Sequence, residues 1–308
     1  MKTLDFSEIG ENMKWIVRLA FQALLCSFLT ISNVSAQGHM DLGKEPTLKQ
    51  KAEIYLYKNE FTNSIDMFSQ AIEKDNSDHY LYRGIAQAYN RSGKIDEGVD
   101  AFNKFLQFSP SNALYGLGYL HYLIKENEQS VLFLRESIKM NPQNTLAMNN
   151  LGAILSENDS FDEALGLVKK AISIAPKEGM FYMNLQLIYS KMGKENTFIE
   201  EYEESVKQGL KDVSTGYGKA YATSLRQQGF KSFSEGKPEK SIQQFEKIIE
   251  IYRDIKHPGG ELAGLFALGL LHEEFGGQNK AFDIYREILK INPDHIQARE
   301  RLNQNKNN

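Results

Sequence analysis

The chain has 308 residues, a formal net charge of -4 and a sequence pI of about 6.0, with 41% hydrophobic and 25% charged residues. This balance excludes wholesale disorder, and the absence of a Lys/Arg cluster argues against nucleic-acid binding, which depends on neutralising phosphates. The single cysteine, Cys26, excludes a disulfide framework and a thiolate metal site within one chain.

The N-terminal region has the pattern of a secretory signal peptide. A mostly apolar run over 19–31 follows Lys14 and Arg18, and Val34 and Ala36 occupy the two cleavage positions. A basic start, an apolar core and a small-x-small exit are typical of such signals. The run is shorter than the roughly 20 residues that span a bilayer as a helix. We expect removal of residues 1–36 and an exported protein, periplasmic or secreted, with no stable membrane span.

Two alternatives to a cleaved signal stay open. Residues 16–34 could remain as a membrane anchor, or Cys26 could carry a lipid, although Leu25 stands where a lipobox has a small residue. The first twelve residues include three acidic side chains and fit a signal poorly. We therefore hypothesise that translation starts at Met13.

The remainder of the chain repeats with a period near 34 residues. Pro110, Pro142 and Pro176 close successive amphipathic stretches, 32 and 34 residues apart. The two clearest units contain Leu151, Gly152, Phe161, Ala164, Val168, Ala171 and Pro176, and Tyr82, Ala86, Tyr89, Gly93, Gly98, Phe102 and Pro110. They resemble the tetratricopeptide repeat, a 34-residue helix-turn-helix unit with large and small residues at fixed positions.

The resemblance implies an all-α fold, a right-handed superhelical α-solenoid of about seven helix pairs over 45–302. Small residues at positions 8 and 20 let paired helices approach, and each pair must stack on its neighbours to bury its apolar face. The expected units are 45–78, 79–112, 111–144, 145–178, 179–212, 222–255 and 262–295. Phe198 stands where the fifth unit should have Ala, so the register of its second helix is open.

Several segments fall outside the repeat pattern. We expect 37–44 to be a linker, 256–260 a loop, about 295–302 a capping helix and 303–308 a disordered tail. The segment 212–221 contains two glycines and is either an insertion between repeats or an extension of the next first helix.

The sequence predicts no enzyme, no cofactor and no metal site. Its six histidines are scattered, no His or carboxylate cluster has metal-ligand spacing, and no nucleophile-elbow or phosphate-loop motif occurs. His121 occupies a position that usually holds Tyr, and we expect it to pack with a hydrogen bond.

Two functions remain. One is an exported protein-protein interaction module that binds a peptide segment or partner protein, of unknown identity, in its concave groove. The alternative is a structural assembly subunit of a cell-envelope complex that docks through its convex face or its ends. Exposed apolar residues lining a groove would favour the first, and an apolar outer ridge or end the second.

In the tetratricopeptide family, positions 5, 9 and 12 of each first helix face the groove. These are Arg83, Gln87 and Asn90 in the second unit, Tyr115, Tyr119 and Tyr122 in the third, Asn149, Ala153 and Ser156 in the fourth, and Met183, Leu187 and Ser190 in the fifth. The family's carboxylate clamp combines Lys, Asn and Arg. Only Asn149 matches it in units three to five, so we do not expect capture of an acidic C-terminus.

A second resemblance concerns position 6, where Asn in successive repeats can hold a peptide backbone. Asn150 and Asn184 occupy this position, although Asn there is also common without a binding role. The three tyrosines of the third unit should form one stripe on their helix. If the stripe anchors a partner, Tyr119→Ala should weaken binding and affect folding little, because position 9 is not a core position.

Overall fold

The structure is a computed structural model that describes residues 45–304, and these form fifteen helices and no strand. The helices run as α2 (Leu48–Tyr57), α3 (Phe61–Lys74), α4 (His79–Ser92), α5 (Ile95–Phe105), α6 (Pro110–Leu123), α7 (Asn127–Met140), α8 (Thr145–Glu157), α9 (Phe161–Ile174), α10 (Gly179–Lys191), α11 (Glu195–Lys207), α12 (Lys211–Ser234), α13 (Pro238–Asp254), α14 (Pro258–Glu274), α15 (Gln278–Ile291) and α16 (Ile296–Gln304). Seven consecutive pairs and a last helix confirm the predicted all-α solenoid. The signal, Met13, Cys26, the anchor over 16–34 and the linker over 37–44 lie outside the described residues.

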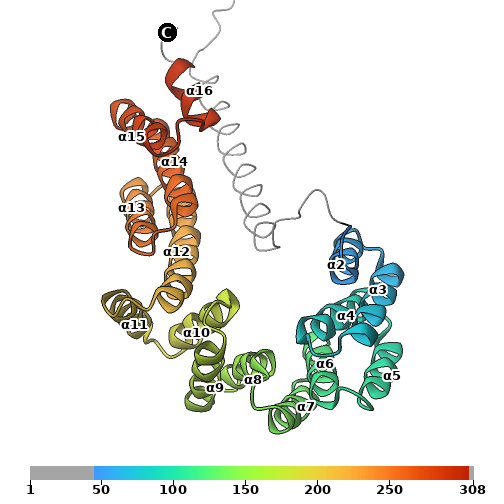
Figure 1. The fold of residues 1–308 in the computed structure, drawn as a ribbon. Helices are drawn as coiled ribbons and strands as arrows, with labels where there is room; N and C mark the ends of the chain where they lie inside the picture. Colours follow the sequence, from blue (N-terminus) through green and yellow to red (C-terminus); the bar gives the residue numbers. More distant parts are fainter. Residues whose placement is uncertain (1–44, 305–308) are drawn as a thin grey trace, which may run out of the picture.

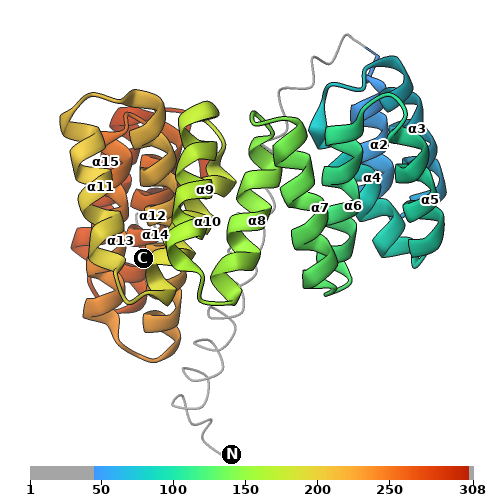
Figure 2. The ribbon, with the colours of Figure 1, turned by 90° about the horizontal axis from the view of Figure 1, so that it is seen from below.

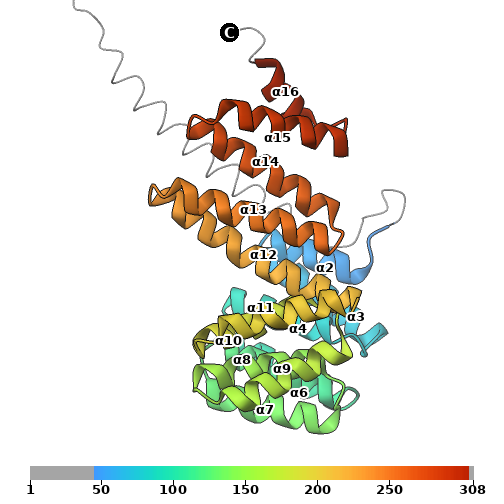
Figure 3. The same ribbon diagram turned by 90° about the vertical axis from the view of Figure 1, so that its left-hand side faces the viewer.

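The pairs follow an arc whose inner wall is made by the first helix of each pair. In Figure 1 the helices α2, α4, α6, α8, α10 and α12 lie on the inner side, and their partners lie outside. Along the arc, successive first helices from α2 to α12 contact one another. Figure 2 shows the helices from α2 to α9 side by side, and Figure 3 shows the later ones stacked up to α16.

Every turn inside a pair uses one residue in the left-handed region of backbone space. A residue with positive φ ends the first helix and lets the chain reverse, which is easiest for glycine. The seven residues are Asn59, Gly93, Lys125, Asp159, Gly193, Gly236 and Gly276. The same backbone conformation therefore reverses the chain in all seven pairs.

Close packing within a pair has two versions. In the fourth pair, Gly152 lies so near the second helix that a Cβ would stand 2.7 Å from Val168 Cγ2 and 3.1 Å from the Ala164 carbonyl oxygen. In three other pairs a buried serine hydroxyl on the second helix donates a hydrogen bond to a carbonyl of the first. These bonds join Ser64 to Ala52 at 2.9 Å, Ser130 to Gly118 at 2.7 Å and Ser241 to Gly229 at 2.9 Å.

The segment 212–221 is an extension of the first helix of the sixth pair, since α12 is continuous for 24 residues. Its glycines are sites of close approach. A Cβ at Gly216 would stand 2.1 Å from the Tyr182 ring, and one at Gly218 would stand 2.9 Å from Ile255 Cγ2. A larger residue would not fit at either position, because side chains of neighbouring helices fill the space. Of the two alternatives that the sequence left open for this segment, the extended first helix is the correct one.

The fifth pair departs from the close packing of the fourth. Gln186 on α10 and Phe198 on α11 stand where α8 and α9 have the small residues Gly152 and Ala164. The Phe198 ring is buried, with its centroid 5.0 Å from that of Tyr217 on α12. The extended α12 thus packs against the large side chain that replaces a small residue in this pair.

Two predicted boundaries are wrong. The expected loop over 256–260 is shorter, because α14 begins at Pro258, and His257 caps it by accepting a hydrogen bond from the Gly260 amide at 2.9 Å. Proline suits the first helical position, where no intrahelical amide bond is needed. The expected disordered tail also begins too early, since α16 continues through Gln304.

Candidate functional site: the concave surface

The three tyrosines of α6 form a stacked row on the inner wall. The ring centroids of Tyr115 and Tyr119 are 6.1 Å apart, and those of Tyr119 and Tyr122 are 6.3 Å apart, with interplanar angles of 13° and 24°. Their spacing of four and three residues puts them on one helical face. Tyr115 is fully buried, Tyr119 is 7% exposed and Tyr122 is half-buried.

Side chains of α4 cover the tyrosine row. Gln87 Nε2 donates a hydrogen bond to the Tyr119 hydroxyl at 3.0 Å, and the Arg83 guanidinium lies 5.7 Å from the centre of the Tyr119 ring. The expectation that Tyr115 and Tyr119 face an open groove, with position 9 outside the core, is therefore wrong. Both rings belong to the packed interior of the superhelix.

The physical reason is the tight curvature of the inner wall between the second and fifth pairs. Arg83 Nη1 on α4 stands 3.5 Å from Met180 Sδ at the start of α10, across 97 residues of sequence. Figure 1 shows α4 and α10 on either side of α6 and α8 along the arc. Side chains that would face an open groove in a flatter solenoid instead touch one another here.

The asparagines of the inner wall bond to one another. Asn184 Nδ2 donates to Asn149 Oδ1 at 3.0 Å, and Asn149 Nδ2 donates to Asn150 Oδ1 at 3.4 Å. Asn149 is buried, so it is not available to a partner as the sequence suggested. Asn150 Nδ2 is also buried, without a hydrogen-bond partner in the part of the chain that the structure describes.

Two predicted residues on α10 do reach the surface. Met183 is 50% exposed and Leu187 is 52% exposed, and they lie one helical turn apart on the inner helix of the fifth pair. Asn184 and Asn90 are half-buried. Met183 and Leu187 therefore form an accessible apolar strip on α10.

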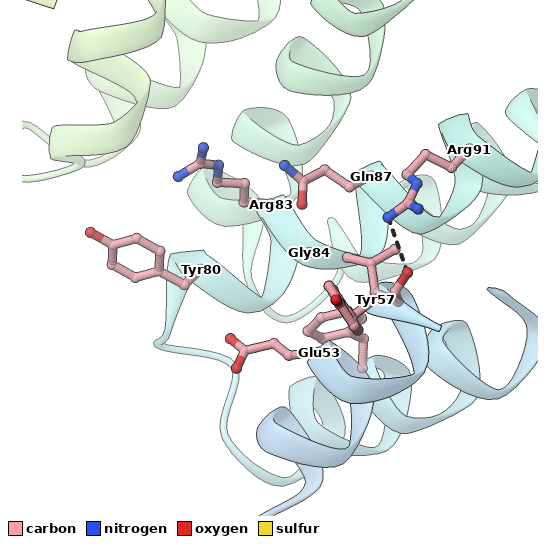
Figure 4. A pocket seen from close by; sticks show the side chains of 9 residues that line it. Glu53, Tyr57, Tyr80, Arg83, Gly84, Gln87 and Arg91 are labelled. Atoms are coloured by element: carbon pink, nitrogen blue, oxygen red, sulfur yellow. Dashed lines mark hydrogen bonds between the residues drawn. The ribbon is translucent and has the colours of Figure 1, made fainter. Parts of the chain in front are cut away.

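A pocket of about 340 Å³ opens between α2 and α4. Figure 4 shows its nine lining residues, with Glu53, Tyr80 and Arg83 pointing toward the same side. Its lining consists of Glu53, Leu56, Tyr57, Phe68, Tyr80, Arg83, Gly84, Gln87 and Arg91. Leu56 and Phe68 provide an apolar floor, while Tyr57 is 82% exposed.

The pocket includes the predicted Arg83 and Gln87, but the sequence reasoning missed its α2 wall. Glu53 and Leu56 stand at positions 9 and 12 of the first expected unit. The positional rule used for units two to five would have identified them if it had been extended to that unit. Tyr57, Tyr80 and Arg91 lie at other positions and carried no signal under that rule.

Arg91 has a structural role at the edge of the pocket. Its Nη1 donates to the Leu56 carbonyl at 3.0 Å, its Nη2 bonds to Asn59 Oδ1, and its guanidinium lies 5.1 Å from the centre of the Phe61 ring. A guanidinium at the C-terminal end of α2 satisfies free carbonyls and suits the helix dipole. Arg91 therefore ties α4 to α2 and is already satisfied.

The other two charged side chains of the pocket are Glu53 and Arg83. Among residues 45–304 neither Glu53 nor Arg83 has an ion-pair partner within 4.0 Å. Burial raises the pKa of the Glu53 carboxyl, although Lys49 partly opposes this. Burial lowers the pKa of Arg83, but the nearby Tyr119 and Tyr115 side chains raise it by more, so the guanidinium stays charged.

A histidine that the sequence singles out has a structural role. His121 pairs with Glu126 at 2.7 Å and stacks on Phe133, which is the packing role expected of it. Residues 45–304 contain no group of three His, Cys, Asp or Glu side chains able to hold a metal ion. Within the same range, no helix has both the length and the apolar character needed to cross a membrane.

Comparison with known proteins identifies the repeats. Three family models, each described as tetratricopeptide repeat, match residues 49–113, 111–144 and 145–175. Among curated proteins, the chain is 26% identical over 260 residues to the protein CTR9 homolog of Arabidopsis thaliana, covering 82% of this chain and 23% of that protein. It is 31% identical over 119 residues to the peroxisomal targeting signal receptor of Kluyveromyces lactis, covering 33% of this chain and 21% of that protein. The chain thus spans less than a quarter of either relative.

Solved structures give remote matches. The crystal structure of MamA protein matches at 19% identity and a TM-score of 0.37, over 53% of this chain and 91% of that one. The APC/C hetero-tetramer Cut9-Hcn1 matches at 15% identity and a TM-score of 0.43, over 83% of this chain and 55% of that one. Together with the helix pairs, the family models lead to one conclusion. The chain contains tetratricopeptide repeats over residues 49–175, within a helical solenoid of the protein-interaction type.

Proposed function

We propose that this is an exported interaction module that binds an extended peptide segment along its concave surface. The observation that carries the proposal is the continuity between the α2/α4 pocket and the apolar strip of α10. Arg83 lines the pocket and contacts Met180, and the exposed Met183 lies one turn further along α10. A pocket beside an exposed apolar strip, edged by polar side chains, is typical of a peptide-binding surface.

Site-specific photo-crosslinking in cells tests this surface. We would replace Tyr57 and Leu187 individually by p-benzoylphenylalanine, with Leu132 on the outer helix α7 as a matched exposed control. A partner that binds along the concave surface should crosslink from positions 57 and 187 and not from 132. Crosslinks from 132 alone would contradict the proposal.

The second candidate, a structural assembly subunit, has its own support. Leu132 on the outer helix α7 and Ile296 on the last helix α16 are both exposed apolar residues outside the groove. Crosslinks from 132 or 296 to the same neighbour would favour permanent docking through the convex face or the end of the solenoid.

Export is proposed from the sequence alone, on the basic flank at Lys14 and Arg18, the short apolar run and the exit at Ala36. The mass of the protein from the cell exterior or periplasm should correspond to a chain beginning at Gln37. Recovery of residues 16–34 in a detergent fraction would support the anchor, and a lipid on Cys26 would support a lipoprotein.

A further inference from the structure

Two histidines cap helices at the C-terminal end of the solenoid. His257 Nδ1 accepts a hydrogen bond from the Gly260 amide at 2.9 Å at the start of α14. His295 Nδ1 accepts one from the Ala298 amide at 3.3 Å at the start of α16. An imidazole nitrogen accepts a hydrogen bond only while it carries no proton. Both caps therefore need a neutral ring whose proton is on Nε2.

Two helices in the N-terminal half have caps that bond to the same helical position but do not titrate. Asn144 Oδ1 accepts from the Ala147 amide at 3.2 Å, and Thr47 Oγ1 accepts from the Gln50 amide at 3.2 Å. His295 follows Asn-Pro-Asp as Asn144 follows Asn-Pro-Gln, so the two residues occupy equivalent positions of the repeat. The last helix thus has a titratable base where the fourth pair has an amide.

The surroundings of both rings disfavour the charged imidazolium. Burial lowers the pKa of His295, whose ring centroid lies 5.4 Å from that of Phe266, and a hydrogen bond to its own backbone opposes this only in part. Burial also lowers the pKa of His257, and Lys219 on α12 lowers it further, again with partial opposition from its own backbone. The His257 ring packs on Tyr252, with the centroids 5.3 Å apart. Both rings are therefore neutral at pH 7.5 and gain a proton below the usual pKa of 6.5.

The charged side chains that flank the two rings in the chain are paired with each other. Asp294 and Arg299, beside His295, stand 3.7 Å apart, and Arg253 and Glu261, on either side of His257, form an ion pair at 2.7 Å. Among residues 45–304 neither ring has a carboxylate oxygen within 4.0 Å. No carboxylate is thus placed to compensate the positive charge that either ring gains.

The last helix, α16, depends on its cap because it is short. It has nine residues, and an isolated helix of that length is not stable in water. It is held at the end of the stack by the fully buried Ala298 and by the ion pair of Arg301 with Glu273 at 3.2 Å (Figure 3). Protonation of His295 would leave the Ala298 amide without its partner and would add a positive charge at the positive end of the helix dipole.

We infer that His295 makes the docking of α16 sensitive to pH: when its ring binds a proton, the cap is lost and α16 separates from the end of the solenoid. This regulation goes beyond the proposed function and does not depend on what the concave surface binds. His257 loosens the first turn of α14 over the same range. Because the folded-state pKa of each histidine is lowered, the stability from the neutral ring is complete above pH 6.5 and is lost as the pH falls toward the folded value.

The consequence of release is a change in the surface at one end of the molecule. Phe266 on α14 is 4% exposed with α16 in place, and the His295 ring packs on it. When α16 separates, Phe266 loses this cover. Acidification thereby uncovers apolar surface at the C-terminal end of the solenoid, whereas the caps of α2 and α8 keep the N-terminal half unchanged.

Hydrogen-deuterium exchange of the full chain at pH 7.5 and pH 5.5 tests the inference, with each rate divided by the intrinsic rate at that pH. In wild type the protection of α16 should fall about threefold to tenfold on acidification. The helix α8, with its Asn144 cap, should keep its protection and is the internal control. His295→Asn should keep α16 protected at both pH values, because asparagine caps helices and does not titrate.

Three outcomes would overturn the role of His295. The first is a wild-type α16 that keeps its protection at pH 5.5, and the second is a loss of protection that persists in His295→Asn. His257→Asn separates the two caps, since it should keep the first turn of α14 protected at pH 5.5 and leave the response of α16 unchanged. The third outcome is a His257→Asn variant that abolishes the response of α16, which would make α14 the sensing helix.

NMR titration of the histidine rings gives a readout that does not depend on exchange. At pH 7.5 the ring nitrogens of His257 and His295 should show the Nε2–H tautomer, and both rings should titrate below pH 6.5. An Nδ1–H tautomer at neutral pH would contradict both caps, because that nitrogen could not then accept a hydrogen bond. Circular dichroism at pH 7.5 should show equal helix content for wild type and His295→Asn, which excludes misfolding of the variant.

Discussion

The side-chain amide of Gln87 donates a hydrogen bond to the hydroxyl of Tyr119 across 3.0 Å, and this contact joins α4 to α6 on the inner wall. From their positions in the repeat alone, both side chains would be expected to bind a partner. Tyr119 also lies between the rings of Tyr115 and Tyr122, and beneath Arg83. The inner wall of the second and third pairs is thus a packed interface within the chain.

Tyr119→Ala should destabilise the protein. Removing a nearly buried aromatic ring leaves a cavity and should lower the free energy of unfolding by about 3 kcal/mol. Tyr119→Phe keeps the ring and loses only the bond from Gln87, so it should cost about 1 kcal/mol. Urea unfolding of both variants is the measurement. A Tyr119→Ala protein as stable as wild type would mean that the row is open to solvent.

Gly152→Ala should destabilise the protein strongly, although it adds only one methyl group. The added carbon would stand 2.7 Å from Val168 Cγ2 and 3.1 Å from the Ala164 carbonyl oxygen, and that backbone atom cannot move without separating α8 from α9. We expect the free energy of unfolding to fall by about 1–3 kcal/mol. Gly166→Ala on α9 is the matched control, because no atom lies within 4 Å of its added methyl. Its free energy of unfolding should rise by roughly 0.5–1 kcal/mol, because Ala has a higher helix propensity than Gly. Equal melting temperatures would refute the close approach.

Ser130→Ala tests the hydroxyl-to-carbonyl bonds that join paired helices. The variant loses the 2.7 Å bond to the Gly118 carbonyl but keeps a small side chain at the contact. We expect a cost of about 1 kcal/mol, with a similar value for Ser241→Ala. Since the two pairs are distant in the solenoid, the double variant should show additive effects by chemical denaturation. Unchanged stability in both single variants would indicate that these bonds contribute nothing net.

Glu201 should make stability depend on pH in the acid range. Burial raises the pKa of its carboxyl, but hydrogen bonds from Lys169, Tyr217 and Tyr189 outweigh burial and leave the pKa below the usual value of 4.5. A carboxyl with a lowered folded-state pKa contributes stability above its unfolded pKa, and this is lost as pH falls through the folded value.

Melting curves between pH 6 and pH 3 would measure this contribution. Wild type should lose more stability on acidification than Glu201→Gln, whereas the exposed control Glu200→Gln should follow wild type. Parallel pH profiles for wild type and Glu201→Gln would show that the cluster around Glu201 does not titrate as described.

The sequence by itself determined the architecture of this protein. Apolar residues at helical spacing, small residues such as Gly152 and Ala164, and glycines such as Gly93 and Gly276 fix where helices form, pair and turn. These are local relationships within one repeat, so they can be read without knowing how distant repeats meet. For the same reason the sequence alone predicts a packing role for His121, which its bond to Glu126 confirms.

Tertiary structure decided which groove residues can meet a partner. The same positional rule selects the buried Tyr115 and Asn149 and the exposed Met183 and Leu187. What separates them is the curvature of the superhelix, which brings Met180 to Arg83 across 97 residues and closes the wall between them. Curvature accumulates from small rotations between successive pairs, and no pattern inside a single repeat encodes that sum.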